Sequence, residues 1–207
     1  MIHALPTDHP LYQEARARLE ERVEDVKRDF PTRSDWPCQT NAPPSDLLFS
    51  CLTIHKKEEL SLIYDVVAKG GLFLGVLAGN NSLYELRDSL LHAEIALKGG
   101  ASLRVPPFPH SGDLGKALVA TGFALPVVDV ETVTLDYPDL PSLMTDLRTR
   151  GLTNSHAERS RIFAPRTLFD KAQEIYAERY PSPSGGIAVT VDLVFLHGWK
   201  EETHRRR

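Results

Sequence analysis

The sequence predicts an α/β fold in which a largely parallel sheet is covered by helices on both faces. Two apolar runs, residues 46–52 and 72–77, flank a helix-length segment, which is the pattern of a strand–helix–strand unit. Both runs are continuously apolar, as is typical of strands that are buried on both faces. Strand-like and helix-like segments continue to alternate as far as residue 196. We expect about four strands.

The first half of the chain begins with an amphipathic helix over residues 11–30, in which Leu19, Val23, Val26 and Phe30 recur at helical spacing. Pro31 ends it. Residues 32–45 contain three prolines and are expected to form an irregular connector. A strand over 46–52, a helix over 57–68 and a strand over 72–77 follow. The Gly-Gly pair at 70–71 is expected to provide the tight turn into the last of these.

The second half continues the alternation. Asn81-Ser82 is expected to cap a helix over 83–97 that ends at Gly99. After a proline-rich loop, a short helix begins at Ser111 or Asp113 and closes at Gly122. The next elements are a strand over 123–137, helices over about 140–150 and 166–180, and a last strand over 187–196. The charged residues 200–207 are expected to be disordered.

Composition bounds the class of protein. A net charge of -4 and a pI near 6.1 give no reason to expect a nucleic-acid-binding surface. Only Cys38 and Cys51 are present, which argues against a disulfide framework and fits a reducing compartment; Cys51 is expected to be buried. No apolar run reaches the roughly 20 residues of a membrane span. We expect neither a secretory signal nor a typical transit peptide, although a chain from which a presequence had been removed would look the same.

Several stretches resemble one known family. In chain order they are Lys69-Gly-Gly71, Leu83-Tyr-Glu-Leu-Arg-Asp-Ser-Leu90, Arg104-Val-Pro-Pro-Phe108, Asp113-Leu-Gly115, Gly122-Phe-Ala-Leu-Pro126, Leu143-Met-Thr-Asp-Leu-Arg148, Gly151 with Asn154, and Gly198-Trp199. This succession resembles the class I S-adenosylmethionine-dependent methyltransferases. Within them it resembles the branch containing the mitochondrial complex I assembly factor that hydroxylates an arginine, and its alphaproteobacterial relatives. The resemblance implies a Rossmann-like sheet.

The chain departs from that family at its cofactor-binding half. Family members carry a glycine-rich Asp-x-Gly-x-Gly loop soon after the first helix and an acidic residue after the second strand. Neither pattern is present, and residues 32–44 are too few, because one βαβ unit takes about 30 residues. We therefore expect an N-terminal helix (1–31), a connector that replaces the cofactor half (32–45), a truncated methyltransferase-like half (46–199) and a tail (200–207), with no bound cofactor.

Few residues are candidates for chemistry. His55 follows a strand, where open α/β sheets bind ligands, but the preferred interpretation is that it caps the next helix. Ser50 lies at the same edge and is a candidate cofactor contact, but it has no base partner visible in the sequence. The resemblance places Arg104, Arg148 and Asn154 in loops on the substrate side; a surface ion pair is the alternative for Arg148. The scattered histidines lack ligand spacing and no Cys-x-x-Cys occurs, so no metal site is expected.

The missing half is expected to leave strand 46–52 at an edge of the sheet, where unpaired backbone groups invite another chain. Leu47, Leu48, Phe49 and Leu52 are the candidate partner-binding residues. Three arrangements satisfy this edge: the connector folds back over it, a second copy adds to it, or a different protein docks there.

These observations lead to a preferred hypothesis and an alternative. The chain is expected to be a degenerate, non-catalytic methyltransferase-family protein that binds other proteins. By resemblance, it would act as a scaffold or assembly factor of a respiratory or other complex in the mitochondrial matrix or bacterial cytoplasm. The alternative is an active S-adenosylmethionine-dependent methyltransferase or protein-arginine hydroxylase with an unconventional cofactor site. A non-functional gene fragment is a third possibility.

Overall fold

The computed structural model describes residues 6–38, 42–54, 56–149 and 164–202. Its strands form a single sheet with the order β1-β2-β3-β5-β4. The described residues divide into two compact units. We call residues 6–79, 109–131 and 193–202 the sheet unit, and residues 80–108 and 132–192 the helical unit. Strands β4 (Ala124–Tyr137) and β5 (Ile187–Trp199) contribute residues to both units.

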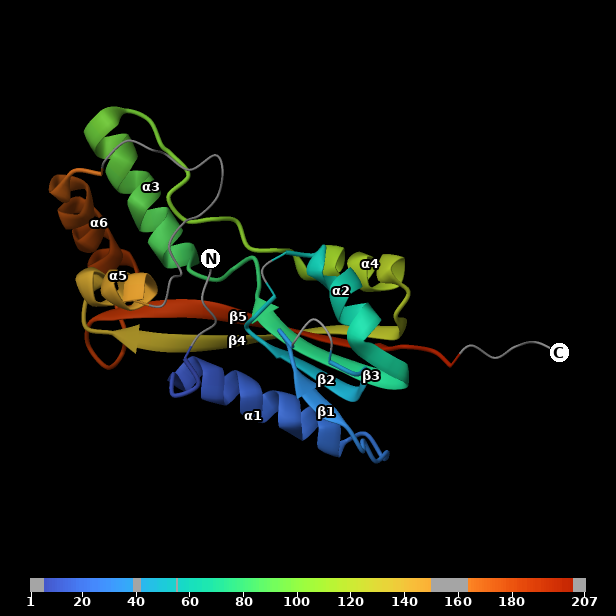
Figure 1. Ribbon diagram of the computed structural model, residues 1–207. Helices are drawn as coiled ribbons and strands as arrows, with labels where there is room; N and C mark the ends of the chain where they lie inside the picture. Colours follow the sequence, from blue (N-terminus) through green and yellow to red (C-terminus); the bar gives the residue numbers. More distant parts are fainter. Residues whose placement is uncertain (1–5, 39–41, 55, 150–163, 203–207) are drawn as a thin grey trace. The chain divides into compact units, whose positions relative to one another are not determined.

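The sheet unit has helices on both faces of its strands, as the sequence predicts. β1 (Arg33–Asp35), β2 (Ser45–Cys51) and β3 (Val67–Ala78) are parallel, and β3 pairs with β5 in antiparallel fashion. Helix α1 (Pro10–Glu24) lies on one face, and α2 (Glu59–Val66) and α4 (Ser111–Thr121) lie on the other (Figure 1). The α/β class is thus confirmed, with five strands among the described residues in place of the expected four or so.

Each face of the sheet unit has its own packing. On the α2 and α4 side, Phe73 stacks on Phe123 at 5.5 Å between ring centroids, within a core that includes Leu48 and Leu118. On the α1 side, arginine side chains cover aromatic rings of the strands. The Arg16 guanidinium lies 4.2 Å from the centre of the Phe49 ring, and that of Arg22 lies 3.6 Å from the centre of the Phe195 ring.

The edge of β2 is occupied by β1, which is the first of the three arrangements considered above. Arg33, Ser34 and Asp35 pair in register with Leu47, Leu48 and Phe49, whose side chains are buried. Thr32 and Asp46 fix this pairing: the Asp46 carboxylate accepts from the Thr32 amide and hydroxyl at 3.1 and 2.7 Å. These bonds hold the pKa of Asp46 below its usual value. The expected unpaired edge at 46–52 is corrected, since the connector folds back over it.

Two glycines that were expected to form a turn lie inside β3. The Gly70 amide donates to the Lys200 carbonyl at 2.7 Å, and the Lys200 amide donates to the Gly71 carbonyl at 3.0 Å. Gly70 has a φ of 73°, which favours glycine, and the β2–β3 register shifts at this point. β3 therefore begins at Val67, whereas the sequence places residues 67–68 at the end of a helix and residues 70–71 in a turn. The pairing also gives order to Lys200, the first residue of the tail that was expected to be disordered.

The helical unit contains α3 (Tyr84–Lys98), α5 (Leu140–Thr149) and α6 (Arg166–Arg179) with parts of β4 and β5. Its core includes Leu86, Leu168, Ile187 and the fully buried Tyr176. The predicted cap of α3 is wrong: Leu83 occupies the N-cap with a φ of 56°. Ser82 instead accepts at its hydroxyl from the Asp192 amide at 3.1 Å.

Three further boundaries follow local chemistry. Gly99 and Gly122 end α3 and α4 with positive φ, as predicted. Helix α1 ends at Glu24, earlier than predicted, and Phe30 beyond it stacks against Trp199 at 6.2 Å. No described helix is long and apolar enough to cross a membrane.

Candidate functional site

The carboxyl ends of β1 and β2 are where an open α/β sheet would bind a ligand. The Trp36 amide, directly after β1, donates to the Phe49 carbonyl at 2.7 Å. The Thr53 hydroxyl donates to the Trp36 carbonyl at 3.0 Å and lies 2.7 Å from the fully buried Ser50 hydroxyl. The Trp36 ring packs against the core that contains Leu48 and Phe73. The backbone and side chains at this edge therefore bond and pack with one another.

These residues do not suit the family's cofactor. Close approach of a backbone to an adenosyl ligand requires glycines after the first strand, and residues 32–38 contain none. The acidic residue nearby, Asp35, accepts a hydrogen bond from Arg16 of α1. Burial of Arg16 lowers its pKa, but the bond and charge of Asp35 outweigh this and raise it overall. Ser50, the predicted cofactor contact, thus lies at the expected edge but bonds to Thr53.

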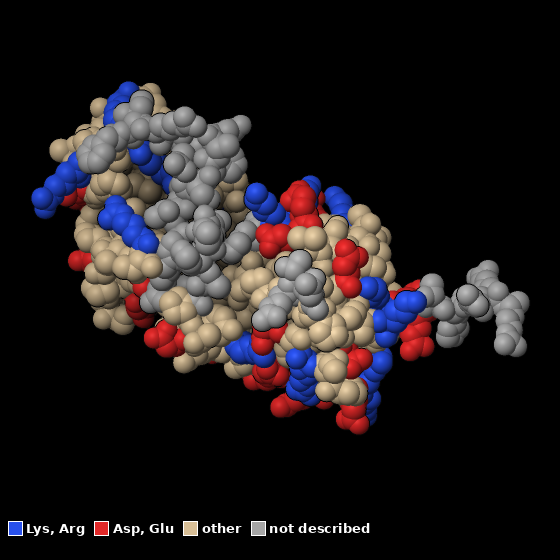
Figure 2. Space-filling view, viewed as in Figure 1, with Lys and Arg blue, Asp and Glu red and all other residues tan. Residues whose placement is uncertain are grey.

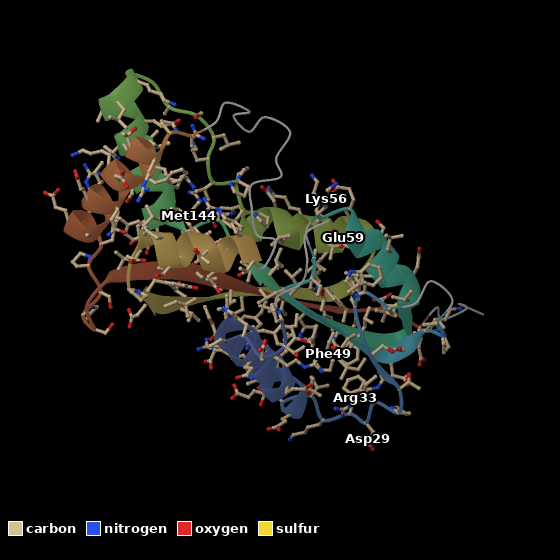
Figure 3. All side chains as sticks on the ribbon, turned by 60° about the vertical axis from the view of Figure 1, so that its left-hand side comes forward. Asp29, Arg33, Phe49, Lys56, Glu59 and Met144 are labelled. Atoms are coloured by element: carbon tan, nitrogen blue, oxygen red, sulfur yellow. The ribbon has the colours of Figure 1, made fainter. Side chains whose placement is uncertain are left out.

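The start of α2 follows the end of β2. His55 lies outside the described residues. The amide of the next residue, Lys56, donates to the Glu59 carboxylate at 3.0 Å, and Figure 3 places these two residues side by side at the beginning of the helix. This bond ties the segment before α2 to the first residue of the helix. The N-cap residue, Glu58, makes no side-chain capping bond.

Arg104 lies in the helical unit, where it contacts a buried acid. Its Nε and Nη2 donate to the Glu94 carboxylate at 3.0 and 2.6 Å, and Glu94 is only 2% exposed. The amide and hydroxyl of Ser102 also donate to Glu94. Burial raises the pKa of Glu94, but the bonds from Arg104 and Ser102 outweigh it, so the pKa lies below its usual value. The arrangement fastens the loop after α3 onto that helix.

The remaining two predicted residues do not join a cluster. Arg148 is exposed in the last turn of α5, where a cation interacts favourably with the helix dipole, and it has no ion-pair partner among the described residues. Asn154 lies outside the described residues. Ser50 therefore lies in the sheet unit, whereas Arg104 and Arg148 lie in the helical unit, on the loop after α3 and on α5 respectively.

Two surface hollows occur in the helical unit. The first, of about 490 Å³, is lined by Tyr137, Asp139, Pro141, Ser142, Thr145, Asp146 and Thr149. The second, of about 470 Å³, is lined by Asp136, Tyr137, Pro138, Ser184, Gly185 and Gly186. The polar groups bond locally: the Tyr137 hydroxyl donates to Asp146 at 2.9 Å, and the Ser142 amide donates to Asp139 at 2.8 Å. Neither lining pairs a nucleophile with a base.

A buried carboxylate was not predicted from the sequence. Glu85 on α3 is 1% exposed, and its Oε1 accepts from the Thr190 amide at 2.9 Å and from the Thr190 hydroxyl. Helical spacing from Leu86 and Ser89 would have placed Glu85 near the buried face of α3. Among the described residues, no group of three or more histidines, cysteines or acids has a geometry that could hold a metal ion.

The Gly198-Trp199 motif has a structural explanation. A Cβ at residue 198 would lie 2.8 Å from Cβ of Phe123, so only glycine fits beside that ring. The neighbouring Lys200 donates through Nζ to the Tyr64 carbonyl at 2.7 Å, at the end of α2, and burial lowers its pKa. Across the surface near α1, acidic and basic side chains are intermixed and do not form a patch of one sign (Figure 2).

No family model matches the chain. It is 33% identical over 159 residues to the mitochondrial arginine-hydroxylase NDUFAF5 of Danio rerio, an alignment that covers 75% of this chain and 49% of that protein. It is 28% identical over 248 residues to the protein of the same name from Mus musculus, an alignment that covers 95% of this chain and 72% of the mouse protein. A malonyl-[acyl-carrier protein] O-methyltransferase of Nitrosospira multiformis is 31% identical over 158 residues, and this alignment covers 74% of this chain and 49% of that protein.

The chain thus spans about half the length of the fish and Nitrosospira relatives. Among solved structures, the YcgJ protein of Bacillus subtilis overlaps with a TM-score of 0.43 at 13% identity, over 78% of this chain and 67% of that one, which is too low to support an argument. The sequence relationships nevertheless agree with one another. Together with the α/β fold, they show that this chain belongs to the class I S-adenosylmethionine-dependent methyltransferase-like family.

Proposed function

We propose that this chain is a non-catalytic member of its family that acts by binding another protein, as a scaffold or assembly factor of a respiratory or other mitochondrial or bacterial complex. The observation that carries the proposal is the closure of the ligand edge by Trp36, Ser50 and Thr53. A cofactor at this edge would have to displace the Trp36 ring from the core and break the bonds of its backbone.

The length of the chain supports the same proposal. The alignment to the mouse protein is longer than the 207 residues of this chain, so the mouse protein contains aligned residues that have no counterpart here. In the proposal, the missing residues are the cofactor-binding half, and residues 32–45 replace it. The three residues of β1 then give β2 a neighbour on its second side. A sheet completed in this way favours a folded, working protein over a gene fragment.

The class of partner comes from the relatives. Several are named mitochondrial arginine-hydroxylases, and the motifs quoted above resemble the complex I assembly branch. A chain that keeps the fold of such a protein without its cofactor edge retains surfaces for protein contacts. We therefore assign it to the mitochondrial matrix or the bacterial cytoplasm, with a subunit or assembly intermediate of a respiratory complex as the partner.

Isothermal titration calorimetry tests the absence of a cofactor site directly. S-adenosylmethionine and S-adenosylhomocysteine are titrated into the chain and, as a positive control, into the Nitrosospira O-methyltransferase. We expect no saturable heat from this chain. One-to-one binding with a dissociation constant in the micromolar range would refute the proposal and restore the alternative, an active methyltransferase or hydroxylase with an unconventional site.

The protein-binding part needs a separate measurement. Purified chain is mixed with a solubilised assembly intermediate of the respiratory complex and passed over a size-exclusion column. We expect co-elution at a fixed stoichiometry, unchanged by S-adenosylmethionine. Arginine hydroxylation or methyl transfer in the mixture, detected by mass spectrometry and absent without this chain, would contradict a non-catalytic role.

A further inference from the structure

The sheet has a second edge, formed by β4, that the connector does not cover. β4 is the last strand of the sheet order and is 14 residues long. The Val130 amide donates to the Asp129 carboxylate of its own strand at 2.9 Å, as suits a backbone group that faces away from β5. Alternate residues of a strand turn their backbone groups to opposite sides, which places residues 128, 130, 132, 134 and 136 on the outward side. This edge has no neighbouring strand among the described residues.

The edge lacks most of the features that discourage pairing. Natural edge strands are commonly short or carry lysines, inward-pointing charges or prolines. β4 contains no lysine or arginine, and its one proline, Pro126, lies near its beginning. Its exposed apolar residues include Leu125 and Val127, with exposed fractions of 75% and 52%. A long, apolar and unprotected edge favours the addition of another strand.

Two acidic residues of β4, Asp129 and Glu131, give the edge only limited protection, because each forms an ion pair with α1. In the sheet unit, Arg22 donates to Asp129 at 2.9 Å and to Glu131 at 2.5 Å, and Arg18 also donates to Glu131. Each of these carboxylates therefore has a cationic partner from its own molecule. The repulsion that two such strands would otherwise exert on each other is reduced.

We propose that β4 pairs antiparallel with β4 of a second copy of this chain, about a two-fold axis at Thr132. All the residues that form the contact lie on this single strand. Outward-facing Thr132 then lies opposite its own symmetry mate, and Val130 lies opposite Thr134. A strand that pairs with itself in this way satisfies the two-fold symmetry that most homodimers have.

The charge pattern of β4 selects this register. With the axis at Thr132, pairing extends from Val127 opposite Tyr137, and no carboxylate faces another: Asp129 lies opposite Leu135 and Glu131 opposite Val133. Moving the axis to Val130 would set Asp129 opposite Glu131, and moving it to Glu131 would set that residue opposite itself. Directly opposed like charges destabilise a strand pair. Axes beyond Thr132 avoid this conflict but shorten the paired region.

The dimer is expected to be weak, because one strand pair forms a small interface. We expect a dissociation constant on the order of 10 to 100 µM, as befits an interface at the low end of the known size range. Sedimentation velocity from about 1 to 200 µM, on either side of this range, should show a monomer–dimer equilibrium. A chain that sediments as a monomer throughout would overturn the proposal. Cofactor binding plays no part in it, so its failure is distinguishable from failure of the proposed function.

Cysteine cross-linking tests the register. In a Cys38→Ser background, Thr132→Cys places two thiols opposite each other, with Cα atoms about 5.5 Å apart in a hydrogen-bonded pair, within the range that a disulfide spans. In the matched control Thr134→Cys, the two introduced cysteines lie four residues apart along the strand direction, because residue 134 faces residue 130 of the second copy. Their separation is then about 13 Å, too far for a disulfide. Burial raises the pKa of Cys51 to about 12, so that thiol does not compete. We expect rapid covalent dimers from Thr132→Cys alone; equal or absent cross-linking would overturn the register.

A second pair of variants covers the case in which Thr132→Cys disturbs the fold, since the Thr132 hydroxyl donates to Asp192 at 2.9 Å. Val130→Lys adds a charge at the outward edge, whereas Leu62→Lys adds the same charge on α2 at a side chain that is 56% exposed. We expect Val130→Lys to weaken dimerisation at least tenfold and Leu62→Lys to leave it unchanged. Equal effects of the two substitutions would contradict pairing through β4.

Discussion

Removing the Arg104 side chain decides whether this residue belongs to the structure or to a substrate site. In Arg104→Ala, Glu94 loses its nearest cationic partner, whereas Ser102 continues to donate to it and Lys98 remains as a more distant partner at 3.8 Å. Loss of one partner of a buried pair typically costs about 3–5 kcal/mol. Because the bonds from Ser102 remain and the Arg104 side chain is itself 14% exposed, we expect about 2–3 kcal/mol here.

The measurement is the free energy of unfolding from urea denaturation, with Glu94→Gln and the double variant completing a thermodynamic cycle. Glu94→Gln keeps an acceptor for Ser102 and removes the charge, so Arg104→Ala should cost much less in its presence. A thermal midpoint lowered by roughly 4–12 °C is expected for Arg104→Ala in a chain of this size. If Arg104→Ala is as stable as the parent, the ion pair does not hold the loop, and a ligand-binding role for Arg104 regains support.

The same pair predicts a dependence on pH. The pKa of Glu94 is lowered in the folded protein, so its contribution to stability is fully present above the unfolded pKa of about 4.3. That contribution is lost as the pH falls from there through the folded value. Glu94→Gln should therefore flatten the acid limb of the stability curve. An unchanged acid limb would show that other carboxylates dominate it.

Two further predictions concern glycine and histidine positions. Gly198→Ala places a methyl group 2.8 Å from Phe123 and should cost about 1–3 kcal/mol, whereas Gly100→Ala, with nothing within 4 Å, should be close to neutral in the same denaturation assay. Burial lowers the pKa of His197, whose Nε2 is buried without a partner, so stability should fall as the pH drops below the unfolded value of about 6.5. His197→Leu should remove this part of the pH dependence; an unchanged pH dependence in this variant would assign the titration elsewhere.

The sequence predicts the elements that local chemistry defines. Gly99 and Gly122 end their helices because each adopts a positive φ that other residues avoid. The buried strands β2 and β3 are evident from continuous apolar runs. Gly70 and Gly71 were misassigned to a turn because their conformation depends on pairing with Lys200, which lies 129 residues further along the chain.

The candidate site was less predictable than the fold. Ser50 was placed correctly at the end of a strand, but its bond to Thr53 and the closure by Trp36 depend on how the connector folds. Arg104 was assigned to a substrate loop by resemblance, and nothing in the local pattern indicates that Glu94, ten residues earlier, is its partner. Side-chain partners across a loop follow from three-dimensional packing, which neither periodicity nor motif spacing encodes.

In the proposed function, strand β1 explains how a family member could lose a large part of its sheet and keep the remainder. Three residues have no periodicity by which a sequence reading could recognise a strand. Their stability comes from neighbours: Thr32 and Asp46 exchange hydrogen bonds beside the strand, and the Trp36 ring joins the core after it. Without such a cover, β2 would expose its backbone beside buried leucines. The residues that close the edge of the sheet are also those that occupy the ligand edge, so stability of the shortened sheet and loss of the cofactor site have a common physical cause in the proposed function.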